Sequence, residues 1–189
     1  MSSASRRRHG LVAVAGAAVL VLTMALPASA GMFIRERYSD SDAFSYDDCG
    51  FVVDVTVEFG GVFQIRTGTG DDASAFFAHD NYWYRETHVR ESDGKTFVVS
   101  GNGNFIEAKA VRIEGSIFTF TSVNAGQLFT IRDGDGHVVL RDRGAIVETI
   151  LFDTTGDDEP GGDFLGILDT TFHGGFPSFD ADFCAIWND

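Results

Sequence analysis

The residues best suited to chemistry lie in one short segment, "NYWYRETHVRE", which runs from Asn81 to Glu91. On a β-strand, alternate side chains face the same side of the sheet. One face of this segment would therefore carry Tyr82, Tyr84, Glu86, His88 and Arg90. A carboxylate beside an imidazole and phenols can move protons or orient a polar ligand. A plainer interpretation also fits, in which Trp83 and Val89 pack inward and the polar side chains decorate a solvated face.

Glu148 is a further candidate, because it alternates with the apolar residues Ile146 and Ile150. A carboxylate on an apolar face must be neutral, paired or hydrated, and a raised pKa would suit a general acid or base. An ordinary exposed glutamate also fits, because Val147 and Leu151 make the other side apolar as well. The sequence thus predicts a ligand-binding set made of Tyr82, Tyr84, Arg85, Glu86, His88 and Glu148.

Acidic, glycine-rich loops could hold calcium, which prefers about six to eight oxygen ligands. The segment "DTTGDDEPGGD" offers Asp153, Asp157, Asp158 and Asp163, and "RDGDGH" offers Asp133 and Asp135. Neither loop has the EF-hand spacing, and hairpin turns select Asp and Gly for their own conformational reasons. Calcium is therefore a secondary expectation, and no other cofactor is expected.

Sequence motifs of familiar catalytic sites are missing, since the chain has neither a G-x-S-x-G elbow nor an H-E-x-x-H pair. The formal net charge of −14 disfavours nucleic acid as a partner. We expect a non-catalytic domain that binds a small molecule or an extracellular partner. Two alternatives stay open: a small barrel enzyme of cyclase or isomerase type with a polar-aromatic cavity, or a surface or structural protein without a small ligand.

The N-terminus predicts export. Three arginines at 6–8 precede an apolar run from Leu11 to Leu26, and "PASA" ends in the small-residue pattern that signal peptidase accepts. An uncleaved anchor is the alternative, although the run is slightly short for a span of roughly 20 residues. The predicted organisation is a signal peptide at 1–30, an acidic arm at 31–48 and a single β-domain at 49–189. The mature protein would be secreted, without membrane association.

Strand patterns dominate the rest of the chain. "FVVDVTVEF" (51–59) alternates apolar and polar residues, which is typical of a half-buried strand. Gly60-Gly61 predicts a tight turn or bulge, and "GNGN" (101–104) predicts a break. We expect about eight to ten short strands joined by local turns, which make an antiparallel meander.

The two cysteines, Cys49 and Cys184, predict one disulfide in an exported protein. Cys49 begins the first expected strand, and Cys184 lies in the last one. A disulfide requires Cα atoms within about 7 Å, so the bond would make these strands neighbours and the meander a closed or partly closed barrel. A β-sandwich is the alternative, and the sequence does not decide between the two if the thiols are free.

Several segments resemble an uncharacterised family of exported actinobacterial β-proteins. They are "DNYWYRE" (80–86), "GNGNF" (101–105), "VLRDRG" (139–144), "FDTTGD" (152–157) and "FC" (183–184). The resemblance implies export and a β-domain, but no activity, cofactor or site. In outline the expected fold is also similar to allene oxide cyclase-like and lipocalin-like barrels, which is an analogy of fold alone.

Overall fold

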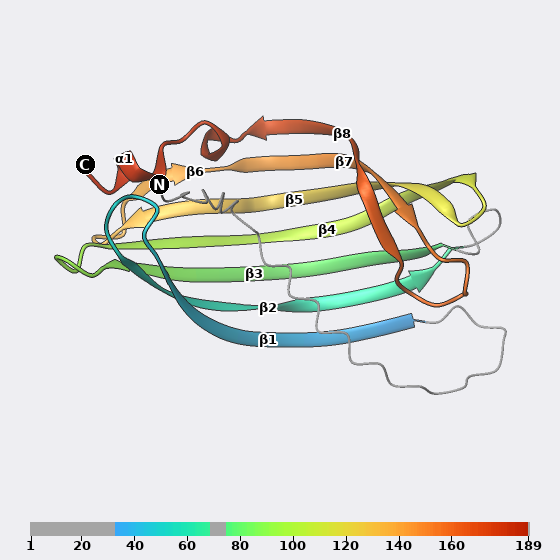
Figure 1. Cartoon of the computed structure of the whole chain (residues 1–189), viewed down its shortest axis with the longest axis horizontal. Helices are drawn as coiled ribbons and strands as arrows, with labels where there is room; N and C mark the ends of the chain where they lie inside the picture. Colours follow the sequence, from blue (N-terminus) through green and yellow to red (C-terminus); the bar gives the residue numbers. More distant parts are fainter. Residues whose placement is uncertain (1–32, 69–74, 189) are drawn as a thin grey trace, which may run out of the picture. The chain divides into compact units, whose positions relative to one another are not determined.

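A computed structural model describes residues 33–68 and 75–188, so the expected signal peptide lies outside the described residues. They form one antiparallel sheet of eight strands in the order β1-β2-β3-β4-β5-β7-β8, with β6 paired to β5 beside this path (Figure 1). The strands are β1 (Phe33–Tyr46), β2 (Val53–Thr67), β3 (Phe76–Arg90), β4 (Thr96–Glu114), β5 (Ile117–Asp133), β6 (Val138–Arg141), β7 (Arg143–Asp153) and β8 (Asp163–Gly175). A 3₁₀ turn η2 (Pro177–Phe179) and a short helix α1 (Phe183–Ile186) follow. The all-β antiparallel meander is confirmed.

The predicted disulfide is also confirmed, but the barrel that was argued from it is not. Cys49 and Cys184 are bonded, with their Cα atoms 5.3 Å apart. Cys184, however, belongs to α1 and not to the last strand. The bond therefore ties the C-terminal helix to the segment before β2, and no pairing joins β1 to β8 in the described part of the chain.

Residues 31–48 differ from the expected solvated arm, because they contain β1. This strand pairs with β2 along its whole length, from Phe33 opposite Arg66 to Tyr46 opposite Val53. It is an edge strand and nearly all of its side chains are exposed. Without a buried side, its sequence lacks the apolar alternation that reveals a strand.

The two predicted interruptions at glycines are wrong. Gly60-Gly61 lies inside the unbroken β2, and "GNGN" (101–104) lies inside β4. Glycine within a strand often marks a place where another group approaches the backbone closely. Aromatic rings from neighbouring strands make that approach here, as described below.

The register defines two faces of the sheet. Val53, Val55 and Gly61 on β2 stand opposite Arg90, His88 and Tyr82 on β3. We call this side the tyrosine face, because all four tyrosines of the chain (Tyr38, Tyr46, Tyr82 and Tyr84) lie on it. The opposite side, which carries Trp83, is called the tryptophan face.

Two clusters of buried residues form the core, near opposite ends of the strands. The first contains Val53, Val55, Phe97, Val99, Ile131 and Trp187, and the second contains Ala75, Phe77, Ala110, Phe118 and Phe120. The first cluster lies under the C-terminal segment, whose Trp187 ring meets Phe97 edge-on at 4.7 Å between centroids. An open sheet thus acquires a core at this end because the chain folds back over it.

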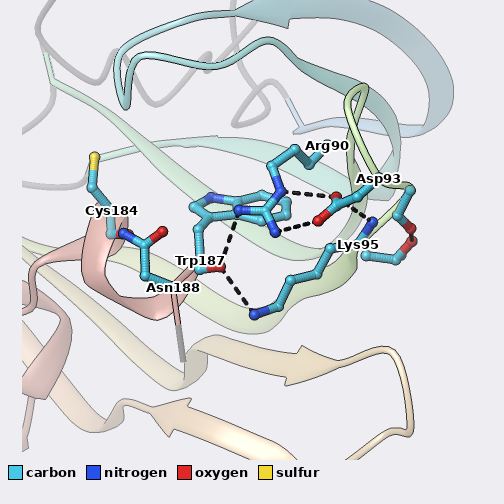
Figure 2. A network of polar contacts seen from close by, with 8 residues as sticks. Arg90, Asp93, Lys95, Cys184, Trp187 and Asn188 are labelled. Carbon is cyan, nitrogen blue, oxygen red and sulfur yellow. Dashed lines mark hydrogen bonds and ion pairs between the residues drawn. The ribbon is translucent and has the colours of Figure 1, made fainter.

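Polar contacts hold this C-terminal cover in place. Arg90 Nη1 and Lys95 Nζ both donate to the carbonyl oxygen of Trp187, at 3.2 and 3.0 Å (Figure 2). Asp93 orients the arginine through two hydrogen bonds, and this pairing lowers the pKa of Asp93 to about 2. Cationic groups at the C-terminal end of a helix satisfy carbonyls that have no partner within it.

None of the described helices is long and apolar enough to cross a membrane.

Candidate functional site

Three tyrosines lie across glycines of the neighbouring strand on the tyrosine face. Tyr38, Tyr82 and Tyr84 stand directly opposite Gly61, Gly103 and Gly101. A Cβ atom built on these glycines would lie 2.6 Å from Tyr38 Oη, 2.7 Å from Tyr82 Oη and 2.5 Å from Tyr84 Cε1. Only a residue without a side chain leaves room for the rings. We call these three rings the tyrosine layer.

Each phenol of the tyrosine layer reaches across its glycine to the next strand. Tyr38 Oη donates to Asp80 Oδ2 at 2.7 Å, and Tyr82 Oη donates to Asn124 Oδ1 at 2.9 Å. Tyr84 Oη donates to the carbonyl oxygen of Leu128, also at 2.9 Å. Burial raises the pKa of all three phenols, so they remain protonated donors at neutral pH. Their hydroxyl hydrogens are committed to the protein, which leaves them poorly placed for proton transfer to a ligand.

Glu86 and His88 form the other polar group on this face. His88 Nε2 lies 2.8 Å from Glu86 Oε2, and His88 Nδ1 lies 3.4 Å from Tyr46 Oη. Their side chains retain 13% (His88) and 29% (Glu86) of their exposure. The pair is therefore partly covered, at the margin of the first core cluster. The contact has the geometry of a structural hydrogen bond. Both side chains are also partly exposed to solvent, as proton transfer to a ligand would require.

The structure does not gather the whole predicted ligand set. The shared face of Tyr82, Tyr84, Glu86 and His88 is confirmed by the register, whereas Arg85 lies on the opposite face. Glu148 lies on β7 opposite Ser122 of β5, and the strands β4 and β5 separate it from β3. The expectation that Trp83 packs inward is wrong, because 46% of this residue is exposed. Ligand binding by this set stays a prediction.

Glu107 is a partly buried carboxylate that the sequence reasoning missed. The pairing of β3 with β4 ends at His79 opposite Ile106, and one residue further Glu107 Oε2 accepts the N–H of Ala78 at 2.6 Å. Desolvation by burial raises the pKa of Glu107. In "NFIEAKAV" nothing distinguishes it from a solvent-facing glutamate. Glu107 accepts a backbone N–H of β3 because β3 and β4 separate there, and this separation depends on the tertiary structure.

The tryptophan face presents a supported aromatic ring. Trp83 stands opposite Gly60, and a Cβ on that glycine would lie 3.2 Å from indole atoms Cζ2 and Nε1. The indole therefore rests on the β2 backbone with its outer side toward solvent. Its other cross-strand neighbour is the exposed amide of Asn102 on β4. The outer side of the indole keeps a large apolar area in water, and a ligand that covered this area would gain free energy.

Amides and an imidazole continue this surface beside Trp83. Asn104 Nδ2 donates to Asn81 Oδ1 at 2.6 Å and lies 2.7 Å from His79 Nε2. Asn81 Nδ2 lies 3.2 Å from the same imidazole nitrogen. These side chains hold one another in place and retain further donor and acceptor capacity. They form a pre-ordered polar border for the indole.

A hollow of about 580 Å³ lies on the other side of Trp83 along β3. Arg85 and Glu58 stand opposite each other in it. Its remaining lining comes from Ser41, Asp42, Ala43, Thr56, Val57 and Thr87. Small and hydroxyl-bearing side chains leave this part of the face recessed. Glu58, Arg85 and Thr87 of this hollow lie on the same face of the sheet as the indole.

The expected calcium ligands do not come together. In the part of the chain with described positions, no three of Asp153, Asp157, Asp158 and Asp163 bring their ligand atoms within 4.8 Å of one another. Asp153 Oδ1 instead accepts the N–H of Thr155 at 2.9 Å, which is the turn-building use of this residue type. Ligand atoms of Asp133, Asp135 and His137 do lie within that distance. There, Asp133 Oδ1 accepts the backbone N–H groups of the other two, which accounts for the turn without an ion.

Comparison with protein-family models, curated proteins and solved structures yields no match to this chain.

Proposed function

We propose that this protein is a secreted, non-catalytic binding domain that holds a carbohydrate on its tryptophan face. The observation that carries the proposal is the half-exposed indole of Trp83, supported from beneath by Gly60. Export is supported by the signal-like N-terminus and by the Cys49–Cys184 disulfide, which suits an oxidising compartment.

The chemistry of the surface matches a sugar ring. A pyranose has a face of C–H groups, which packs on an aromatic ring, and a rim of hydroxyls, which needs donors and acceptors in the same plane. Trp83 offers the ring, while Asn102 and the ordered Asn81–Asn104 pair offer amides beside it. Amides suit hydroxyls because they donate and accept at once. A supported indole also loses little rotational freedom on binding.

Charge favours a neutral glycan over an anionic polymer. The chain carries a formal net charge of −14, which repels phosphate and sulfate groups. Beside the indole, the one basic side chain of the hollow, Arg85, stands opposite Glu58. With Asp42 the lining carries two carboxylates against one guanidinium, so it suits neutral hydroxyls better than anionic groups.

Affinity gel electrophoresis of the mature protein tests the proposal, with a soluble β-glucan, a xylan and a mannan as probes. We expect at least one polymer to retard migration, and Trp83→Ala to weaken that binding at least about tenfold, as expected for loss of an aromatic stack. Trp83→Phe should keep part of the affinity. The matched control is Phe44→Ala, because Phe44 is 49% exposed but lies on the tyrosine face. Equal binding by wild type and Trp83→Ala would refute the site, and no retardation by any neutral polymer would refute the ligand class.

An enzyme of cyclase or isomerase type is the second candidate, and the Glu86–His88 contact of 2.8 Å favours it. In that case His88 would exchange a proton with the substrate while Glu86 orients the imidazole. His88→Asn should then abolish turnover and leave glycan retention unchanged. This separates the candidates, because the two sets of residues lie on opposite faces.

A further inference from the structure

We propose that the protein forms a two-fold symmetric dimer in which β8 pairs antiparallel with β8 of a second copy. β8 is the last strand on the sheet path; its later part runs along the upper edge of the sheet in Figure 1, while its first part bends across the other strands together with the end of β7. β7 occupies one side of it, from Arg143 opposite Gly175 to Asp153 opposite Asp163. In the described residues no strand pairs with the other side, so a row of backbone N–H and C=O groups faces outward there.

The side chains of β8 are as unusual as its position. Twelve of its thirteen residues are exposed, although much of the strand is apolar. The exposed fractions are 60% for Phe164, 49% for Leu165, 52% for Ile167, 59% for Leu168 and 46% for Phe172. Scattered exposed apolar residues are ordinary, but a row of them along one free edge marks an interaction surface.

The opposite edge of the same sheet shows what a protected edge looks like. β1 carries the charged residues Arg35, Glu36, Arg37, Asp40 and Asp42. Charges on an edge strand prevent pairing with other chains. The carboxylates of β8 are limited to Asp163 at its start and Asp169. Charge therefore opposes pairing at the β1 edge and is nearly absent from the β8 edge.

The curvature of β8 favours its own copy as the partner. Register shifts against β7 fall between Thr149 and Ile150 and between Leu151 and Phe152. These bulges add Leu168 and Leu165 to the β8 side and bend the strand. A straight strand would follow such an edge poorly, whereas a second β8 has the same bends. Antiparallel pairing of two identical strands about a two-fold axis is self-complementary.

The exposed apolar side chains of β8 set an upper limit on the area of such a dimer. Five half-exposed apolar side chains offer at most roughly 500 Å² per copy, or about 1,000 Å² in total, and pairing in the plane of the sheet would cover part of it. That is near the lower bound for a stable interface, before the backbone hydrogen bonds are counted. The negative net charge of each copy opposes association. Added salt should therefore tighten the dimer by screening this repulsion.

Sedimentation equilibrium of the mature protein over a wide concentration range tests the proposal. We expect a monomer–dimer equilibrium for the wild type. Ile167→Lys should raise the dissociation constant at least about a hundredfold, because it buries an unpaired ammonium group. The control is Ile113→Lys, because Ile113 is 59% exposed on β4, away from this edge. Circular dichroism of each variant verifies that the sheet is intact.

Three outcomes would overturn the proposal. They are a wild type that stays monomeric, equal weakening by Ile167→Lys and Ile113→Lys, and open-ended polymers in place of a dimer. Trp83→Ala distinguishes this proposal from the proposed function, since it should weaken glycan retention and leave the dimer unchanged. The failure of one proposal therefore does not imply the failure of the other.

Discussion

Replacing Gly103 by alanine should destabilise the sheet, although alanine is usually the better residue in a strand. The new Cβ would lie 2.7 Å from Tyr82 Oη and 2.9 Å from Leu128 Cδ2, so the tyrosine must move. Overpacking of this kind costs about 1–3 kcal/mol. Loss of the Tyr82–Asn124 hydrogen bond adds about 0.5–1.5 kcal/mol, and relief of the glycine penalty returns about 0.5–1 kcal/mol. We expect a net loss of about 2 kcal/mol in the free energy of unfolding.

Urea unfolding of the mature protein measures this change, with Gly175→Ala as the control, because no atom lies within 4 Å of a Cβ built on Gly175. A double-mutant cycle makes the test specific. In a Tyr82→Ala background the ring is gone and only the Leu128 Cδ2 contact at 2.9 Å remains, so Gly103→Ala should cost much less than it does in the wild type. An additive result, with the same loss in both backgrounds, would refute the argument that the glycine exists to accommodate the ring.

Further predictions concern the disulfide and Glu107. Reducing the Cys49–Cys184 bond, which spans a sequence separation of 135, should lower the free energy of unfolding by about 4–5 kcal/mol in the chain-entropy model. After reduction, α1 is held mainly by Trp187 and by the Arg90 and Lys95 contacts to its carbonyl oxygen. The indole fluorescence of Trp187 should therefore shift to the red before the sheet unfolds. If both transitions coincide, the C-terminal segment is not a separable cover. The raised pKa of Glu107 means that the folded state penalises its ionised form. Its unfavourable contribution is absent below the unfolded pKa and grows as the pH rises through the folded pKa. Glu107→Gln, whose amide oxygen can still accept from Ala78, should therefore gain stability relative to wild type between pH 4 and pH 7, and a pH-independent difference in urea unfolding would contradict this.

The sequence predicted well those features that depend on the pattern within a single strand. Alternation in 51–59 identified the buried side of β2, and alternation in β3 placed Tyr82, Tyr84, Glu86 and His88 on one face. It could not decide which face of β3 was buried, because each face carries aromatic and charged side chains. The burial of the tyrosine face follows from its neighbours, the valines of β2 and the C-terminal cover.

The errors came from features that depend on distant residues. The glycines of "GNGN" predict a break from local rules, which do not include the rings from β3 that these glycines accommodate. Local pattern predicts a strand at Cys184, but Asp182 is a helix N-cap whose carboxylate accepts the N–H groups of Cys184 and Ala185. The apolar letters that follow fit a short helix as well as a strand. That one misassignment was enough to suggest a closed barrel.

The neighbouring glycines on β2 connect the fold to the proposed function. Gly61 admits the ring of Tyr38 on the tyrosine face, and Gly60 admits the indole of Trp83 on the other. Adjacent residues of a strand face opposite sides, so a single Gly-Gly pair lets an aromatic ring lie flat on each face at the same level of the sheet. On the tyrosine face the Tyr38 hydroxyl donates to Asp80, so this ring stabilises the fold. On the tryptophan face the outer side of the ring stays open to solvent. The sheet is therefore rigid where a flat ligand would need a rigid support, and this pre-organisation lowers the entropic cost of binding.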